Sequence, residues 1–193
     1  MSLAVHQKIK KMMVTILYIL VLIFFILLAA MVIVPVFFGA PWHPLSDENI
    51  NRIIKFSDLQ PGETFYDLGS GDGRVLIAAS SNQCLRGVGV EIDPIKVWLS
   101  RYFIIAAKLT NKIRIHRGNM FDFDVSEADV IYLYLTHQAL DRLFPEILDR
   151  MKPSARIICY RFCIRNLEPT KMNKDKNLFW YQVNKGRTVN EYS

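Results

Sequence analysis

The sequence predicts an α/β protein: a doubly wound, mostly parallel β-sheet preceded by one transmembrane helix. Three observations support this fold class. Of the 27 residues in 12–38, 25 are hydrophobic, with Thr15 and Pro35 as the exceptions. From residue 64 onward, short apolar segments typical of strands alternate with longer segments typical of helices. The connections between them are short, as in sheets built from β-α-β units.

Composition limits the number of domains. The chain has 193 residues, of which 51% are hydrophobic, and a net charge of +6. Without the apolar segment, the remainder resembles one ordinary globular domain, which excludes a disordered tail, a disulfide-stapled miniature, a multi-pass transporter and a collagen-like rod. We expect a basic flank over 1–11, a transmembrane helix over 12–38, a linker with a lead-in helix over 39–61, and the α/β domain over 62–193.

The apolar segment predicts a single-pass N-terminal anchor. Its 27 residues would form a helix of about 40 Å, and a hydrocarbon core is about 30 Å thick. A cleaved signal peptide would have a shorter apolar core followed by a polar start, which is absent here. Three lysines before the segment weakly favour an N-terminus inside. The need for a cytosolic-type metabolite, indicated by the glycine motif of the domain, outweighs them and predicts a domain on the cytosolic, or matrix-equivalent, side.

The first half of the domain shows clear boundary signals. Ser46 is a good N-cap for a helix through Lys55, which the Pro61-Gly62 pair should separate from the first strand. We expect a strand over 64–68, a helix over 73–81 opened by a glycine-rich turn, and a strand over 86–91 carrying alternate valines.

The second half continues the alternation. Pro94 should start a long helix to about residue 108, and strands are expected over 113–117 and over the strongly apolar 128–135. A helix over 138–151 should end at Lys152-Pro153. Two further strands are expected over 155–164 and 178–183, and no internal repeat is present.

The most informative motif joins the first strand to the first domain helix. It contains an acid and three glycines, the cofactor-binding candidates being Asp67, Gly69, Ser70, Gly71 and Gly73. Such a turn lets a ligand approach the backbone and the helix N-terminus. A dinucleotide fingerprint has its third glycine where Arg74 stands, which disfavours a nicotinamide oxidoreductase. Asp67 would repel a pyrophosphate and attract a cation, and S-adenosylmethionine carries a sulfonium and an ammonium without phosphate.

Two more candidates follow the next strands. Glu91 ends the second strand, where a carboxylate can bridge ribose hydroxyls. Asn119 and Met120 follow the third strand and are placed to hold the edge and face of an adenine. Each feature is common by itself. Together, in order and on consecutive junctions of strand and helix, they predict a binding site for S-adenosylmethionine.

These motifs resemble those of class I, seven-stranded and Rossmann-like, S-adenosylmethionine-dependent methyltransferases. Within that class the chain is similar to the archaeal protein-lysine methyltransferases and to membrane-anchored mitochondrial relatives that modify the ATP synthase c subunit and the adenine nucleotide translocase. The resemblance covers roughly residues 40–165 and departs at Asn119, where aspartate is usual, and at Cys163, where proline is. The matching segments are 67–74, 91–94, 98–102, 132–135, Arg161-Phe162 and the lead-in 41–44.

The resemblance implies transfer of methyl groups to lysine ε-amines, which requires a neutral amine in an apolar channel. We expect Tyr132 and Tyr134 to face different sides of the fourth strand. Tyr134, nearer the carboxyl end, is the candidate catalytic residue, as a wall or hydrogen-bond partner of the amine. Trp98 and Arg101 are expected to be structural, packing their helix and pairing with acids, and His137 is a weaker candidate.

Charge and cysteine usage limit the partners. Residues 151–193 carry nine basic and three acidic residues, which favours contact with anionic lipid over nucleic acid because no base-stacking motif accompanies them. The three cysteines lack metal-ligand spacing, so no metal is expected. The leading interpretation is a membrane-anchored methyltransferase acting on an accessible lysine of a membrane-associated protein. Two alternatives are methylation of a lipid or quinone-like molecule and a non-catalytic cofactor-binding subunit.

Overall fold

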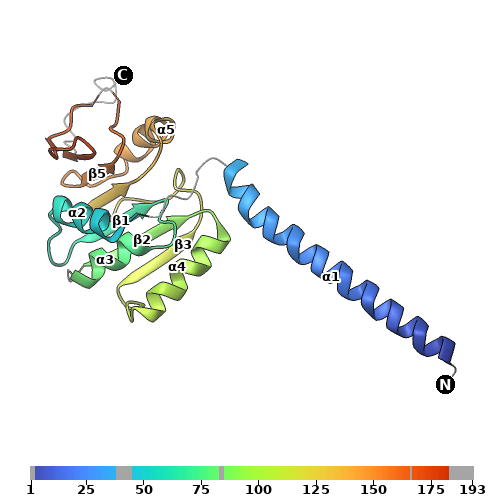
Figure 1. Ribbon diagram of the computed structural model, residues 1–193. Helices are drawn as coiled ribbons and strands as arrows, with labels where there is room; N and C mark the ends of the chain where they lie inside the picture. Colours follow the sequence, from blue (N-terminus) through green and yellow to red (C-terminus); the bar gives the residue numbers. More distant parts are fainter. Residues whose placement is uncertain (1–2, 38–44, 83–84, 166, 183–193) are drawn as a thin grey trace. The chain divides into compact units, whose positions relative to one another are not determined.

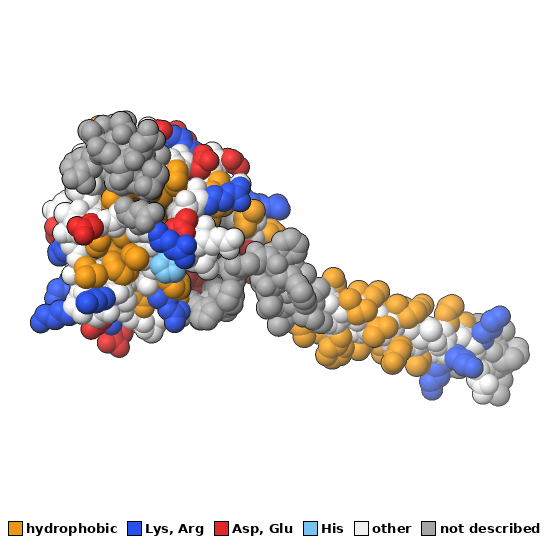
Figure 2. Space-filling model, turned by 90° about the horizontal axis from the view of Figure 1, so that it is seen from above, with side chains coloured by type: hydrophobic (Ala, Val, Ile, Leu, Met, Phe, Trp, Pro, Cys, Tyr) orange, Lys and Arg blue, Asp and Glu red, His pale blue; other side chains and the backbone are white. Residues whose placement is uncertain are grey.

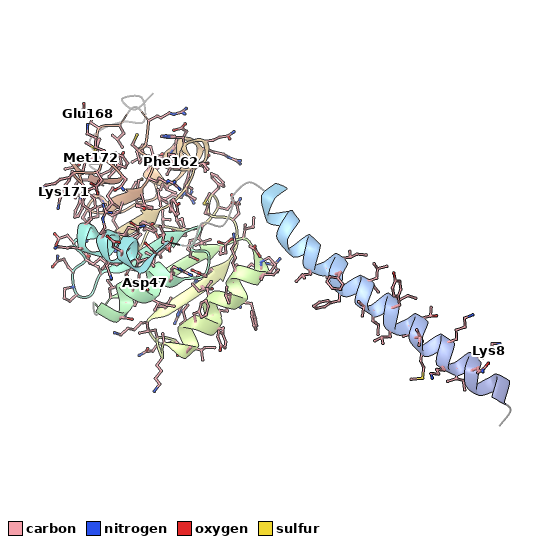
Figure 3. All side chains as sticks on the ribbon, in the orientation of Figure 1. Lys8, Asp47, Phe162, Glu168, Lys171 and Met172 are labelled. Atoms are coloured by element: carbon pink, nitrogen blue, oxygen red, sulfur yellow. The ribbon has the colours of Figure 1, made fainter. Side chains whose placement is uncertain are left out.

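The computed structural model describes residues 3–37, 45–82, 85–165 and 167–182. It forms two units, residues 1–44 and 45–193. In the first, helix α1 (Leu3–Phe37) is apolar on all sides, as the side chains in Figure 2 show, with Lys8 near its basic end (Figure 3). Its segment Gln7–Leu28 is long and apolar enough to cross a membrane. The predicted lead-in residues 41–44 lie outside the described residues.

The second unit contains a seven-stranded sheet in the order β3-β2-β1-β4-β5-β7-β6 (Figure 1). Neighbouring strands from β3 to β5 are parallel, and β7 is antiparallel to both β5 and β6. The predicted doubly wound, mostly parallel sheet is therefore confirmed. The strands are β1 (Thr64–Leu68), β2 (Arg86–Glu91), β3 (Ile113–Arg117), β4 (Val130–Leu133), β5 (Arg156–Tyr160), β6 (Lys171–Met172) and β7 (Leu178–Gln182).

Helices cover both faces of this sheet. Residues of α2 (Asp47–Ser57), α3 (Arg74–Asn82) and α4 (Pro94–Ala106) bury apolar side chains in the core on one face. The opposite face packs against α5 (His137–Leu148) and the segment that connects β3 to β4. This arrangement leaves the carboxyl ends of β1, β2 and β4 together at one edge, where ligands bind in open α/β sheets.

Side-chain caps set the helix boundaries. Ser46 accepts a hydrogen bond from the backbone N–H of Asn49, which confirms it as the N-cap of α2. That helix ends at Asp58, whose left-handed backbone (φ 47°) stops it before the Pro61-Gly62 pair. Asp93 caps α4 in front of Pro94. Thr136 caps α5, which therefore begins one residue earlier than predicted.

Two strands are shorter than the sequence predicts, and one was not predicted. β4 ends at Leu133 because its partner there, Leu68, is the last residue of β1, beyond which the neighbouring chain turns away. β5 likewise ends at Tyr160, although the apolar run continues to residue 164. β6 has only two exposed residues, paired to β7. So short a polar segment carries no periodicity that would predict it.

Candidate active site

The turn between β1 and α3 is fixed to β2 by backbone hydrogen bonds. The N–H groups of Gly69 and Ser70 both donate to the carbonyl oxygen of Val90, at 2.8 and 3.0 Å. The N–H of Gly71 donates to a carboxylate oxygen of Glu91 at 2.9 Å. The first and second predicted motifs therefore belong to one structure, in which the strand-end acid holds the glycine turn in place.

Two of the glycines are required by the backbone, for different reasons. Gly71 has a left-handed φ of 55°, and a Cβ added there would meet nothing within 4 Å, so the space above it is open to a ligand. Gly73 has a φ of 78°, and its added Cβ would lie 3.1 Å from that of Ser100. Gly73 thus lets the start of α3 approach α4 closely. The turn combines an open cradle at Gly71 with a tight helix contact at Gly73.

Three buried acids surround the cradle. Asp67, Asp72 and Glu91 are 3%, 4% and 7% exposed. Asp72 is paired with Arg74, and Glu91 accepts hydrogen bonds from the N–H groups of Gly71 and Asp93. Asp67 accepts no hydrogen bond from any residue that the structure describes. Burial, with smaller contributions from Glu91 and Asp72, raises the pKa of Asp67 to about 8.

This charge distribution selects a class of ligand. An uncompensated buried carboxyl group is stabilised by a cationic partner and destabilised by an anionic one. The ammonium of S-adenosylmethionine would supply a cation beside Asp67, and Gly71 leaves room for its methionine part. A pyrophosphate would meet three carboxyl groups. The residues present therefore fit S-adenosylmethionine and do not fit a dinucleotide.

The remaining cofactor candidates are placed less uniformly. The hydroxyl of Ser70 is buried against Gly89, without a partner among the described residues, so only its backbone can face a ligand. The amide of Asn119 donates to Asp122 at 2.8 Å and its oxygen accepts from the N–H of Phe121, which shapes the loop after β3. Met120 packs partly buried against the core on the α5 face. Their roles in cofactor binding stay predictions.

One residue at this edge was not predicted. Ile92 directly follows Glu91 and is 67% exposed, which is unusual for an isoleucine that ends a buried strand. Its position beside the Glu91 carboxylate suits contact with the apolar face of a purine. The only signal in the sequence was an apolar residue immediately after the strand-end acid.

The tyrosines at the end of β4 form a second part of the site. The hydroxyl of Tyr134 accepts a hydrogen bond of 3.2 Å from the guanidinium of Arg161, and its ring lies 5.1 Å from that of Tyr160. Arg161 has a left-handed φ of 74°, which is costly for a non-glycine residue. Sequence reasoning found Arg161 only as a family match, because its pairing depends on the adjacency of β4 and β5.

The expectation that Tyr132 and Tyr134 face different sides is wrong. Residues two apart in a strand share a face, and both tyrosines pack in the core on the α2, α3 and α4 face. Tyr132 is 1% exposed and stacks on Phe65. Its buried hydroxyl has no partner among the described residues, and burial, followed by the neighbouring Asp67, raises its pKa.

Three weaker expectations have mixed outcomes. Trp98 is 68% exposed rather than packed, and Arg101 donates to the carbonyl of Ile115 instead of pairing with an acid, so the structural interpretation of both is corrected. His137 is partly buried, with its ring 4.7 Å from that of Phe162, a residue labelled in Figure 3. No group of acids, histidines and cysteines able to hold a metal occurs within the described residues.

A hollow of about 460 Å³ lies away from the cradle, between α2, α3 and α4. Asp47, which is labelled in Figure 3, lines it together with Asp72, Arg74 and Phe103. Asp72 and Arg74 already satisfy each other. We assign no ligand to this hollow.

The fold and the cradle together define an S-adenosylmethionine-dependent methyltransferase of the α/β class. Comparison with known proteins specifies the family. A sequence model of the ANTKMT methyltransferase domain matches residues 67–171, and the chain belongs to that family. Its cofactor is S-adenosylmethionine, since solved structures of the same fold contain S-adenosylhomocysteine.

Several relatives are lysine methyltransferases. The chain is 30% identical to the protein-lysine N-methyltransferase of Saccharolobus islandicus, over 69% of this chain and 84% of that protein. It is 26% identical to the Xenopus laevis lysine N-methyltransferase of the ATP synthase C subunit, over 67% of this chain and 56% of that protein. For the adenine nucleotide translocase lysine N-methyltransferase of mouse, the identity is 24%, over 70% and 59%. The chain thus spans less than two thirds of these vertebrate relatives.

The fold has a similar solved structure. The RNA methyltransferase from Salinibacter ruber, in complex with S-adenosyl-L-homocysteine, superposes with a TM-score of 0.72 and is 27% identical. The match covers 76% of this chain and 97% of that one.

Proposed function

We propose that this protein is a membrane-anchored methyltransferase that transfers methyl groups to lysine ε-amines of membrane-associated proteins. The observation that carries the proposal is the juxtaposition at one sheet edge of an acid-lined glycine cradle and the Tyr134–Arg161 pair. Relatives that methylate lysines in two mitochondrial membrane proteins support the choice of acceptor.

Each part of the cradle has a proposed role. Asp67 holds the ammonium of the cofactor, and the turn containing Gly69, Ser70, Gly71 and Gly73 surrounds its methionine part. Glu91 binds the ribose hydroxyls while fixing Gly71, and Asn119 and Met120 hold the adenine. When bound, S-adenosylmethionine supplies a methyl group that is activated by the positive charge on sulfur.

Tyr134 and Arg161 act on the acceptor in this proposal. A free lysine is neutral in only roughly one molecule in a few thousand at pH 7, so a site that disfavours its ammonium form raises the reactive fraction. An amine bonded to the Tyr134 hydroxyl lies close to the Arg161 guanidinium, which donates to that same oxygen at 3.2 Å. Repulsion between the two cations lowers the pKa of the amine.

Replacing Arg161 with glutamine should move the rising limb of the pH–rate profile to higher pH by about half to one unit, because the repelling charge is lost. Arg161→Lys keeps the charge and should leave the limb in place. Initial methylation rates from pH 6.5 to 9.5 at saturating cofactor measure this. An unshifted limb with a uniformly lower rate would reduce Arg161 to a structural residue.

The anchor proposal rests on α1. We propose that residues 12–38 span the membrane after a basic flank over 1–11, that 39–61 form a linker and the lead-in helix, and that 62–193 form the catalytic domain on the cytosolic, or matrix-equivalent, side. The support is the length and apolar surface of Gln7–Leu28. The anchor would keep the site close to membrane proteins and raise their effective concentration.

Mass spectrometry of membrane proteins from cells with and without this gene tests the acceptor. Methyl-lysine should disappear at one or a few sites in the deletion strain and return with the wild-type gene. Lipid extracts of the same cells are the matched control. If the methyl-lysine pattern stayed unchanged while a methylated lipid or quinone vanished, the small-molecule alternative would replace the protein acceptor.

A further inference from the structure

Helix α4 carries most of the exposed apolar surface of the second unit. Among the described residues of that unit, Met172 is the one large hydrophobic residue 36% or more exposed outside 92–105. Four residues of α4 form what we call the α4 stripe: Ile95, Trp98, Tyr102 and Ile105, which are 47%, 68%, 57% and 63% exposed. Contiguous exposed apolar surface of this kind marks an interaction site.

The spacing of the stripe places it on one side of the helix. Its members are three, four and three residues apart, so they line one face. The opposite face is the buried one and contains Val97, Ser100 and Ile104. The rings of Trp98 and Tyr102 are stacked, with centroids 6.2 Å apart and planes at 16°. Helix α4 is therefore apolar toward the sheet and apolar again toward the outside.

Positive charge surrounds the stripe. Residues 94–117 contain no acid and six cations, which we call the basic border: Lys96, Arg101, Lys108, Lys112, Arg114 and Arg117. None of the six takes part in an ion pair between described residues. The border continues from α4 onto β3, which is the edge strand of the sheet beside that helix (Figure 1).

We propose that the α4 stripe and the basic border rest on the surface of an anionic lipid bilayer. Tryptophan and tyrosine favour the boundary between headgroups and acyl chains. A helix with an apolar face and a cationic rim lies in that boundary with its apolar side buried about 5–10 Å. The proposal rests in part on the proposed membrane anchor, because α1 would hold the domain close to such a surface.

The charge and shape of this surface disfavour two other occupants. A second copy of the chain would bring two acid-free basic borders together, and their mutual repulsion opposes pairing. Nucleic acid would use the cations and the aromatic rings, but it would leave the aliphatic Ile95 and Ile105 without a partner. A bilayer satisfies the aliphatic, aromatic and cationic side chains together.

This contact would orient the active site. Helix α4 begins at Pro94, three residues after Glu91 of the cradle. Lipid contact along α4 therefore brings the carboxyl edge of the sheet to the membrane surface. An acceptor lysine at the level of the headgroups would then meet the site directly.

Fluorescence quenching by brominated lipid tests the contact in the full chain. Two variants each keep a single tryptophan: Trp42→Phe with Trp180→Phe keeps Trp98, and Trp42→Phe with Trp98→Phe keeps Trp180. Trp180 lies on β7, toward the other end of the sheet, and is the matched control. Both are reconstituted in phosphatidylcholine–phosphatidylglycerol vesicles, with and without bromine high on the acyl chains. Binding of S-adenosylhomocysteine by each variant confirms folding.

The Trp98 protein should lose about half or more of its fluorescence in brominated vesicles, less in pure phosphatidylcholine, and the Trp180 protein should change little. Equal quenching of both, or none of Trp98 in protein that floats with the vesicles, would overturn the α4 contact alone. Quenching of Trp98 in protein that alkaline carbonate extracts would instead overturn the anchor alone. A shift of Trp98 emission by RNA without vesicles would identify a nucleic-acid surface and overturn the proposal.

Discussion

Replacing Gly71 with arginine is expected to abolish cofactor binding while leaving the sheet folded. The arginine side chain would enter the open space above the turn, where an added Cβ meets no atom within 4 Å. The left-handed φ of 55° adds a backbone cost of about 1–2 kcal/mol, which a domain of this size tolerates. Calorimetric titration with S-adenosylhomocysteine measures the loss, and circular dichroism confirms the fold.

The chain offers a matched control at Gly62. This glycine also has a left-handed φ, 88°, and open space at its Cβ position, but it lies before β1, at the opposite end of that strand from the cradle. Gly62→Arg should therefore lose a similar amount of stability and keep its affinity. Unchanged affinity in a folded Gly71→Arg protein, or equal losses in both variants, would contradict the assigned cradle.

Replacing Asp67 with asparagine is expected to weaken cofactor binding and to stabilise the cofactor-free protein at high pH. The loss of a charge-assisted hydrogen bond of about 1.5–3 kcal/mol corresponds to roughly 10- to 150-fold in affinity. Asp67 has a pKa near 8 in the folded chain and near 3.8 as a model group. The folded state therefore binds an extra proton between these values, and its stability falls as the pH rises through that window.

Asparagine cannot ionise, so the variant escapes this loss. Its melting temperature should match that of the wild type near pH 4 and exceed it by roughly 3–10 °C at pH 9, for about 1–3 kcal/mol. Asp72→Asn is the control with the opposite sign, because it breaks the pair with Arg74. Melting curves at pH 4, 6.5 and 9 without cofactor measure both variants. Destabilisation by Asp67→Asn at every pH would assign Asp67 to the structure rather than to the ligand.

The parallel part of the sheet was predictable from sequence because its strands are short apolar runs with clear ends. The predicted bounds of β1, β2 and β3 agree with the structure. The ends of β4 and β5 were not predictable, since they depend on where a neighbouring strand ends and not on local hydrophobicity. The short β6 exists only through its pairing with β7.

The same distinction applies to the site. The acid and glycines of the turn were readable because they are contiguous, and their order after a strand already indicates a ligand. The inward direction of the Ser70 hydroxyl depends on its packing against Gly89 of β2, and the Tyr134–Arg161 hydrogen bond joins residues 27 apart. Trp98 was misread because apolar residues occur on both sides of α4, and composition does not tell which side is buried.

Methyl transfer by the full chain in phospholipid vesicles tests the proposed lysine methylation most directly. The purified protein would be incubated with S-adenosylmethionine labelled in the methyl group and with membranes from the deletion strain, beside the Gly71→Arg protein as a blank. After acid hydrolysis, we expect label in methylated lysine from a membrane protein, absent from the blank. Label confined to lipid or RNA, or no label above the blank from a wild-type protein that binds S-adenosylhomocysteine, would contradict the proposed function.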